Sequence, residues 1–154
     1  MSSTEQFNQK LRQWTELMSS RSMADTVRFV KQADLSFAQL GALMQLHHGR
    51  QCGVTDIAAR LGVTNAAASQ LVDKLVQAGL VERAEVEHDR RLKALSLTAQ
   101  GRACVEAAHQ ARLGWIAALS EQLSSAQRAA AIHTFDDLLA AAQALPAPEP
   151  APAK

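Results

Sequence analysis

Residues 89–101, with the sequence DRRLKALSLTAQG, constrain the fold of this chain more than any other stretch. Two arginines stand at a polar turn, and Leu95 and Leu97 then alternate with other residues in the manner of a half-buried strand. Thr98 follows at once and opens a long helical pattern, which it is placed to cap. The run therefore predicts a β-hairpin with a basic tip that leads directly into a helix.

Two short helices joined by a tight turn are predicted just before this hairpin. We expect Thr55 to cap a helix over residues 56–61 and Thr64 to cap another over residues 65–78, with Gly62 in the turn between them. The second helix carries an apolar stripe at spacings of three and four residues, made of Ala68, Leu71, Val72 and Leu75. Two helices around a glycine-containing turn form a helix-turn-helix.

The strands of the hairpin are expected over residues 80–84 and 93–97, around a polar tip at residues 85–91. A hairpin this small is not stable alone and must pack on the helices. The predicted fold is mainly α with a small β-hairpin wing, which is a winged helix-turn-helix.

Helical periodicity also flanks this lobe on both sides. We expect a helix over residues 5–33, in which the polar run 19–22 could cause a bend or a break, and a second from a Ser36–Gln39 capping box to Gly49. A long helix should run from Thr98 to Leu123, and a last one should follow a second capping box, Ser124–Gln127.

We therefore expect a single domain over residues 1–145. Its DNA-binding lobe would span about residues 36–98, and the helices of residues 5–33 and 99–145 would be additions for dimerisation. The tail over residues 146–154, PAPEPAPAK, has no apolar mass to order it and is expected to be disordered.

Composition limits the functions open to the chain. The formal net charge is +1, which excludes a globally basic nucleic-acid binder and requires any DNA contact to come from a local positive face. Cys52 and Cys104 do not make a disulfide framework and are expected to be free thiols without a redox role. No secretory signal or membrane-spanning stretch is recognised, so a cytoplasmic protein is expected.

The hairpin run resembles the wing motif of the MarR family of bacterial winged helix-turn-helix transcriptional regulators. The resemblance rests on Asp89-x-Arg91, on Leu95-x-Leu97-Thr98 and on the closing Gly101. GLVER at residues 79–83, SFAQ at 36–39 and TDIA at 55–58 are similar to other element boundaries of that family. The family resemblance implies a homodimer that binds double-stranded DNA and responds to a ligand.

The predicted recognition helix has short side chains away from its apolar stripe, which lets a helix lie deep in the major groove. Asn65 and Gln70 suit adenine, and Ala66 and Ala67 suit thymine methyl groups. The full set of expected contacts on this element is Thr64, Asn65, Ala66, Ala67, Ser69, Gln70 and Lys74. Taken alone, the same helix is better explained as an ordinary alanine-rich surface helix, and it is the wing directly downstream that favours DNA binding. The family commonly has an arginine where Gln70 stands.

The wing is expected to contribute five further DNA contacts: His88, Asp89, Arg90, Arg91 and Lys93. Arg91 matches the family arginine that enters the minor groove, and Asp89 is expected to pair with a neighbouring arginine. The alternative is a solvated charged loop, because residues 81–93 hold as many acidic as basic side chains. The acidic set is Glu82, Glu85, Glu87 and Asp89, and the basic set is Arg83, Arg90, Arg91 and Lys93.

The terminal helices carry more apolar surface than one domain of this size needs, which favours a two-fold dimer over a monomeric core. The residues concerned are Phe7, Leu11, Trp14, Trp115, Leu119, Phe135, Leu138 and Leu139.

The resemblance further implies a pocket for a small aromatic or phenolic effector. The candidate lining is Trp14, Met18, Met44, His47 and Trp115, although plain core packing is the more usual role for each of them. A metal site is not expected, because the adjacent His47 and His48 point about 100° apart on a helix. No catalytic motif stands out, so we expect neither an enzyme nor a cofactor.

The leading hypothesis is thus a ligand-responsive homodimeric repressor on a palindromic operator. The alternative is a protein-interaction module that keeps the fold with weak or lost DNA binding.

Overall fold

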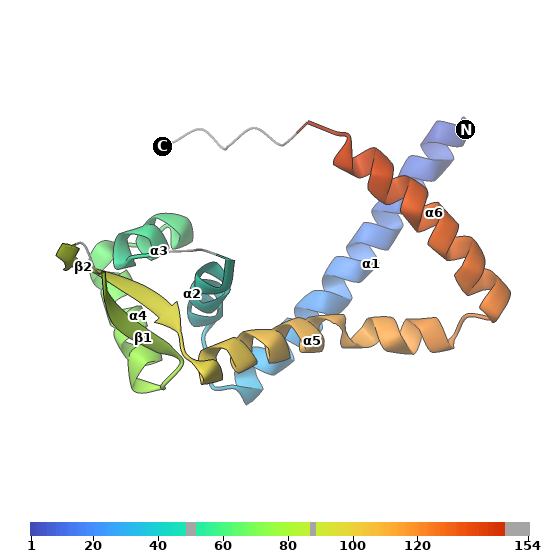
Figure 1. Ribbon diagram of the computed structural model, residues 1–154. Coiled ribbons are helices and arrows are strands. Elements are labelled where there is room, and N and C mark those ends of the chain that lie inside the picture. The colour runs from blue at the N-terminus through green and yellow to red at the C-terminus, as the bar shows by residue number, and fades with distance from the viewer. Residues whose placement is uncertain (49–51, 87–88, 147–154) are drawn as a thin grey trace. The chain divides into compact units, whose positions relative to one another are not determined.

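The computed structural model describes residues 1–48, 52–86 and 89–146, and for residues 84–86 and 89–93 it describes the backbone without the side chains. The described part of the chain contains six helices and one two-stranded antiparallel hairpin (Figure 1). In chain order the elements are α1 (Ser3–Gln32), α2 (Phe37–His48), α3 (Val54–Leu61), α4 (Asn65–Gln77), β1 (Val81–Val86), β2 (Asp89–Leu97), α5 (Ala99–Glu121) and α6 (Ser125–Gln143). This order confirms the mainly helical fold with a hairpin wing.

The chain divides into two compact units, Met1–Gly114 and Trp115–Lys154, and α5 runs through the boundary. The first unit holds α1 to α4, the hairpin and the first two thirds of α5. The second unit holds the end of α5 and α6. The predicted disordered tail lies, beyond Pro146, outside the described residues.

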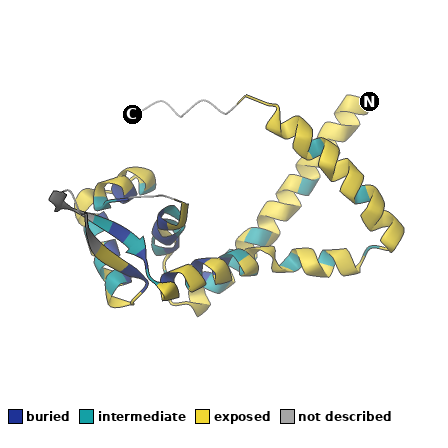
Figure 2. Ribbon diagram, in the orientation of Figure 1, coloured by how far each residue is buried: buried dark blue, intermediate teal, exposed yellow. Residues whose placement is uncertain are grey.

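The core of the first unit lies among α2, α3, α4, the hairpin and the start of α5 (Figure 2). Its largest fully buried side chains are Leu43, Ile57, Val72, Leu75, Val81 and Val105. The apolar stripe expected on α4 faces this core, with Leu71 only partly buried. A smaller cluster of Val30, Leu40 and Ala108 joins the end of α1 to α2 and α5.

The hairpin is longer than the sequence predicted. Val81 pairs with Leu97, and regular pairing continues to Glu85 and Lys93, with an irregularity between Glu85 and Val86. The polar residues expected to form the tip therefore belong largely to the strands. Backbone pairing needs no apolar side chains in a ribbon of this kind, so polarity was a poor guide to where the strands end.

A short third segment extends this ribbon. Cys52 forms an isolated antiparallel bridge with Leu95, whose N–H donates to the Cys52 carbonyl oxygen at 3.0 Å. The segment before α3 thus pairs with β2, and it ties the helix-turn-helix to the hairpin.

Most of the predicted helix ends are confirmed by side-chain caps. Ser36 and Gln39 form the expected reciprocal capping box before α2, and Thr64 Oγ1 accepts from the Ala67 N–H at 3.2 Å. Ser124 and Gln127 form a second box before α6. These caps satisfy N–H groups that the first helical turn leaves without partners.

One predicted helix start was wrong, and the polar run in α1 does not split that helix. The α3 helix begins at Val54 rather than after a Thr55 cap, and its Asp56 carboxylate accepts from the Gly53 N–H at 2.8 Å. The α1 helix continues unbroken through residues 19–22, because that polar run contains no glycine or proline and costs a helix only a few tenths of a kcal/mol per residue.

The last two helices bury fewer of their apolar side chains than the sequence pattern suggested. Along α5 and the residues just after it, Val105 is buried, whereas Leu119 and Leu123 are partly buried and Ile116 is exposed. The described residues of α6 include no buried position at all. Among the described residues of α6, the large apolar side chains of Ile132, Phe135 and Leu139 are exposed.

The start of α5 is fixed against the end of α4 by a compact set of backbone contacts. Thr98 Oγ1 donates to the Gly79 carbonyl at 2.6 Å and accepts from the Gly101 N–H at 3.0 Å. The Thr98 N–H donates to the Leu80 carbonyl at 3.1 Å. Gly101 approaches this same carbonyl so closely that a Cβ atom would overlap its oxygen.

The substitution Gly101→Ala should therefore destabilise the protein by about 1–3 kcal/mol, because the helix and the Leu80 backbone must move apart. Gly114→Ala is the matched control on the same helix. An added Cβ meets nothing there within 4 Å, so the better helix former should stabilise by about 0.5–1 kcal/mol. Urea unfolding at one fixed protein concentration measures both. Equal effects of the two substitutions would show that the close approach is unimportant.

Candidate nucleic-acid interface

The α4 helix presents a narrow polar face opposite its buried stripe. Asn65, Ala66, Ala67, Gln70 and Lys74 are exposed, as is the Thr64 cap, and Ser69 is half-buried. The side chains in the first turn of this face are short, because two of its first three positions are alanine. The structure thus leaves six of the seven predicted α4 contacts open to solvent.

An ion pair fixes the hairpin to this helix. Arg83 on β1 donates to Asp73 Oδ1 on α4 at 2.6 Å, and both side chains are partly exposed. On the opposite strand, Ser96 Oγ donates to Glu82 Oε1 at 3.0 Å. These contacts involve one basic and one acidic side chain of the hairpin. Arg83 therefore anchors the hairpin to α4.

The predicted wing contacts fall on or beside β2. Asp89, Arg90, Arg91 and Lys93 lie along its backbone, but their side chains are outside the description. His88 lies outside the described residues altogether. The expected pairing of Asp89 with an arginine therefore stays a prediction, as does the insertion of Arg91 into a minor groove.

The residues expected to line an effector pocket are spread over three helices and both units. Met44 on α2 is half-buried and packs against both clusters of the core, and His47 is exposed on the last turn of the same helix. On α1, Trp14 is partly buried and Met18 exposed, whereas Trp115 belongs to the second unit. No described cavity brings these five residues together, so an effector pocket formed by them stays a prediction.

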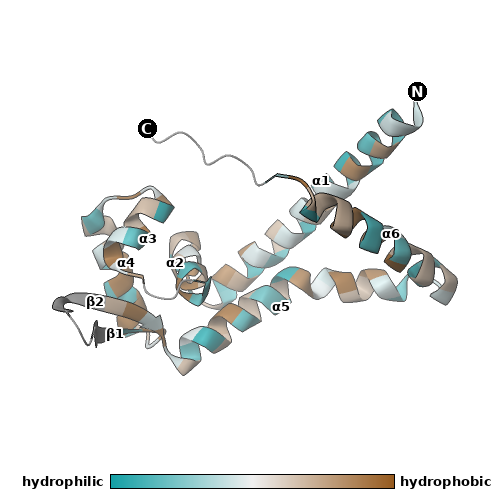
Figure 3. Ribbon diagram, turned by 45° about the horizontal axis from the view of Figure 1, so that its top comes forward, coloured by the Kyte–Doolittle hydropathy of each residue, from teal (hydrophilic) through white to brown (hydrophobic). Residues whose placement is uncertain are grey.

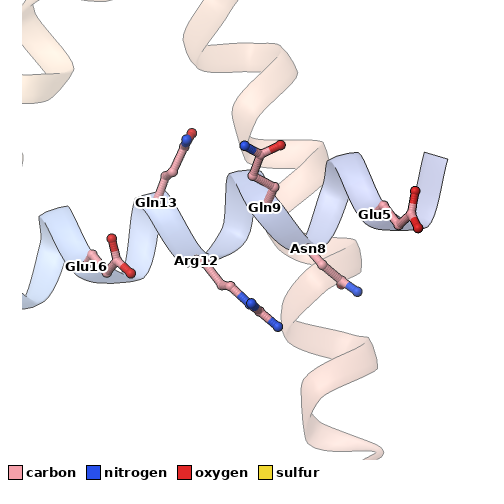
Figure 4. A pocket seen from close by; sticks show the side chains of 6 residues that line it. All are labelled: Glu5, Asn8, Gln9, Arg12, Gln13 and Glu16. Atoms are coloured by element: carbon pink, nitrogen blue, oxygen red, sulfur yellow. The ribbon is translucent and has the colours of Figure 1, made fainter. Parts of the chain in front are cut away.

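Depressions in the surface have other linings. Figure 4 shows one of about 420 Å³ along the N-terminal half of α1, lined by Glu5, Asn8, Gln9, Arg12, Gln13 and Glu16. A second, of about 460 Å³, lies among the ends of α1 and α4 and the starts of α2 and α5, with Leu35, Leu80 and Cys104 among its lining residues. The residues that line the first all carry polar or charged side chains, and none of them is aromatic or aliphatic.

Both cysteines are free thiols, as expected. Burial, and then the negative charge of Asp56, raises the pKa of the Cys52 thiol, which also accepts a hydrogen bond from Gln45 Nε2 at 3.3 Å. Burial likewise raises the pKa of the partly buried Cys104. A raised thiol pKa lowers the fraction of reactive thiolate, which supports the expectation of idle cysteines.

No helix in the described ranges carries an apolar stretch long enough to cross a membrane.

Comparison with known proteins shows which family the winged-helix segment resembles. Residues 33–92 match the family model described as the MarR family. This segment belongs to the MarR family. Over 85 residues the chain is also 31% identical to the Bacillus subtilis (strain 168) protein described as "Uncharacterized HTH-type transcriptional regulator YfiV". That match covers 55% of this chain and about half, 52%, of the relative.

Solved structures extend the likeness of the fold beyond the MarR-family segment. The transcriptional regulator Tm0710 from Thermotoga maritima superposes with a TM-score of 0.77 at 18% identity, over 90% of this chain and 95% of that one. The YusO protein from Bacillus subtilis superposes with a TM-score of 0.66 at 25% identity, over 94% of this chain and 100% of that one. The S. aureus MepR–DNA complex superposes with a TM-score of 0.64 at 23% identity, over 82% of this chain and 95% of that one.

Sequence reasoning missed the two contacts that hold this interface together, namely the Asp73–Arg83 pair and the Cys52–Leu95 bridge. Asp73 and Arg83 are ten residues apart on different elements, so no helical or strand spacing marks them as partners. The tight turn at Gly79, which has a positive φ of 70°, was the available sign that the chain folds back at this point.

We expect a small, salt-sensitive coupling across the Asp73–Arg83 pair. A double-mutant cycle of Asp73→Asn and Arg83→Met, measured by urea unfolding, should give about 0.2–1 kcal/mol, as for partly exposed pairs. The coupling should fall when the salt concentration is raised to about 1 M, where the screening length is about 3 Å. A coupling independent of salt would contradict an electrostatic anchor.

Proposed function

We propose that this protein is a DNA-binding transcriptional regulator that reads a palindromic operator as a homodimer. The observation that carries the proposal is the exposed, slim face of α4 beside a hairpin fixed to it by Arg83, within a segment of the MarR family. An α-helix with short outward side chains fits the major groove, and a hairpin next to it reaches the neighbouring minor groove.

Each part of the α4 face has a role that follows from its chemistry. The amides of Asn65 and Gln70 pair with the N6 and N7 atoms of adenine, and Ala66 and Ala67 contact thymine methyl groups. Ser69 and Lys74 donate to phosphates, which position the helix without reading sequence. Gln70 in place of the common arginine shifts the contribution at that position from charge to base recognition.

The wing supplies the minor-groove contact. In the proposal Arg91 enters the groove, where a narrow, negative channel favours a long cation, and Arg90 and Lys93 meet phosphates. The acidic residues of the wing must then face away from DNA. Two of the eight charged side chains of the wing already have partners within the protein: Arg83 pairs with Asp73, and Glu82 accepts a hydrogen bond from Ser96. These pairings support a wing in which only some of the charged side chains face DNA.

Uncovered apolar surface on the terminal helices supports the dimer. Along α1, Phe7 is 47% and Leu11 42% exposed, and on α6 Phe135 is 47% and Leu139 57% exposed. Figure 3 shows apolar positions recurring along each of these helices. Large apolar side chains exposed in this number are typical of a protein–protein interface. A two-fold dimer would place two α4 helices about 34 Å apart, one turn of the duplex.

We further propose that the protein represses transcription and responds to a small aromatic or phenolic effector, and the family assignment is the support for both. A ligand weakens operator binding only if it binds the two shapes of the dimer differently.

The substitution Arg91→Ala should weaken operator binding by about 1–3 kcal/mol, as expected for one good groove contact. The operator is obtained first by selection from random duplexes, and affinity is then measured by fluorescence anisotropy over a series of salt concentrations. Arg28→Ala is the control, because Arg28 is an exposed arginine on α1 that pairs with Asp25. Unchanged affinity of the Arg91 variant would remove the wing from the interface. A wild-type protein that selects no sequence would favour the interaction-module alternative.

The substitution Leu11→Glu should shift the protein from dimer to monomer, because it places a charge in the proposed interface. Gln6→Glu, at an exposed polar position on the same helix, should leave the dimer intact. Sedimentation velocity at matched concentrations separates the two species. In a separate experiment, removal of residues 1–33 should abolish dimerisation altogether. A sedimentation profile of the truncated protein that shows the same dimer as the wild type would contradict this interface.

A further inference from the structure

We propose that the cavity of about 460 Å³ in the first unit binds a small organic cation, namely a protonated amine with a compact apolar body. The cavity lies where α1 and α4 end and where α2 and α5 begin, and nine described residues line it. None of these residues belongs to the α4 face, to the wing or to the lining expected for an aromatic or phenolic effector. The cavity is therefore a separate site, and its ligand differs in charge from a phenolic acid.

Most of the lining is apolar. Leu80 is buried, and Leu35 and Cys104 are half-buried and pack against the core of the first unit. The other apolar residues of the lining are Ala33, Ala78 and Ala103. Sites for small molecules typically have volumes of about 300–1,000 Å³ and combine apolar walls with a few polar groups. The volume and the lining of this cavity thus suit a molecule with one ring or a branched alkyl group.

The polar side chains of the lining can satisfy an ammonium group. Asp34 is the one charged residue among the nine, and within the described part of the chain its carboxylate has no ion pair or hydrogen bond. The Gln100 Oε1 stands beside the backbone of Gly79, and Gln39 uses its own Oε1 to accept from the Ser36 N–H at 2.7 Å. An ammonium group donates several hydrogen bonds, and Asp34 and Gln100 offer acceptors for them from two different segments.

The sign of the ligand's charge follows from Asp34. Two helices end at the cavity and two begin there, so the partial charges of the helix ends largely cancel. Lys31, in the last turn of α1, is exposed and is not among the lining residues. The carboxylate of Asp34 therefore favours an ammonium over a carboxylate ligand. The preference is modest, because Asp34 is exposed to water.

Backbone hydrogen bonds hold the walls in place before any ligand binds. Asp34 has a positive φ of 52° at the end of α1, and the next residue, Leu35, donates its N–H to the Val30 carbonyl at 3.0 Å. On the other wall the Leu80 carbonyl accepts from the Thr98 N–H at 3.1 Å. A site that is already formed loses little conformational entropy when it is occupied, which favours binding of a small rigid molecule.

A ligand in this cavity would contact the place from which the hairpin leaves α4. Ala78 and Leu80 flank the turn at Gly79, and Gln100 stands in the first turn of α5. Occupancy should therefore stabilise this part of the fold, because the ligand binds the folded chain alone. Any effect on operator affinity rests on the proposed function, so the test measures binding to the protein without DNA.

The test uses the full-length protein and three probes of one shape: benzylammonium, benzyl alcohol and phenylacetate. Two-dimensional amide NMR in neutral buffer of constant ionic strength follows each titration. Benzylammonium should give saturable shifts at residues 33–39, 78–80 and 100–104. It should bind about two- to fivefold more tightly than benzyl alcohol, as expected for one exposed ion pair. Phenylacetate should bind more weakly than the alcohol.

Two variants separate the charge from the cavity. Asp34→Asn should weaken benzylammonium binding by about two- to fivefold and leave benzyl alcohol unchanged. Asparagine also adopts a positive φ readily, so the backbone is preserved. Asp137→Asn, at an exposed position on α6, is the matched control and should change neither.

Ala103→Leu should weaken binding of benzylammonium and of benzyl alcohol by about tenfold or more, because the larger side chain fills the space of the ring. Ala107→Leu, at an exposed position of α5 outside the lining, should not. Circular dichroism confirms that each variant is folded. Absence of saturable benzylammonium shifts at the cavity would overturn the proposal. So would wild-type affinity in the Asp34 or the Ala103 variant.

Discussion

The close contact between α5 and the backbone at Leu80 is the constraint on which the first unit depends. Thr98 bonds to the carbonyl groups of Gly79 and Leu80, and the absence of a side chain at Gly101 lets the helix reach that backbone. The end of α4, the start of β1 and the start of α5 thereby become one rigid corner. Both proposed DNA-reading elements leave from this corner, so their relative direction is set by backbone contacts.

The proposed interface built on that corner has a well-defined local geometry and little net charge. The Asp73–Arg83 pair orients the hairpin on α4 and, being partly exposed, adds little to stability. In the proposed complex with DNA, such an arrangement would give specificity by shape and by placed hydrogen-bonding groups. It also agrees with a chain of formal net charge +1, for which non-specific attraction to DNA is weak.

Most of the helical layout could be predicted from the sequence because caps and apolar stripes are local signals. The Ser36–Gln39 box and the Ala68–Leu75 stripe each lie within two turns, and both predictions were confirmed. What could not be predicted depends on distant residues: the bridge from Cys52 to Leu95, the pairing of Asp73 with Arg83, and the meeting of His109 with α2. Exposure of the apolar residues on α6 shows the same limit, since periodicity identifies an apolar face without telling what covers it.

The pairing of Cys52 with β2 has a consequence for how this protein behaves at high concentration. The far side of β2 is bridged by Cys52 at Leu95, whereas no strand pairs with the outer edge of β1 within the described part of the chain. Open edges invite strands of other molecules to add, and this is how ribbons grow into insoluble fibres. The open strand here reads VERAEV, with a charged residue at three of six positions and a break in its pairing near the end. These features protect an exposed ribbon, which we propose to bind a DNA duplex, from pairing with the ribbon of another copy of the chain.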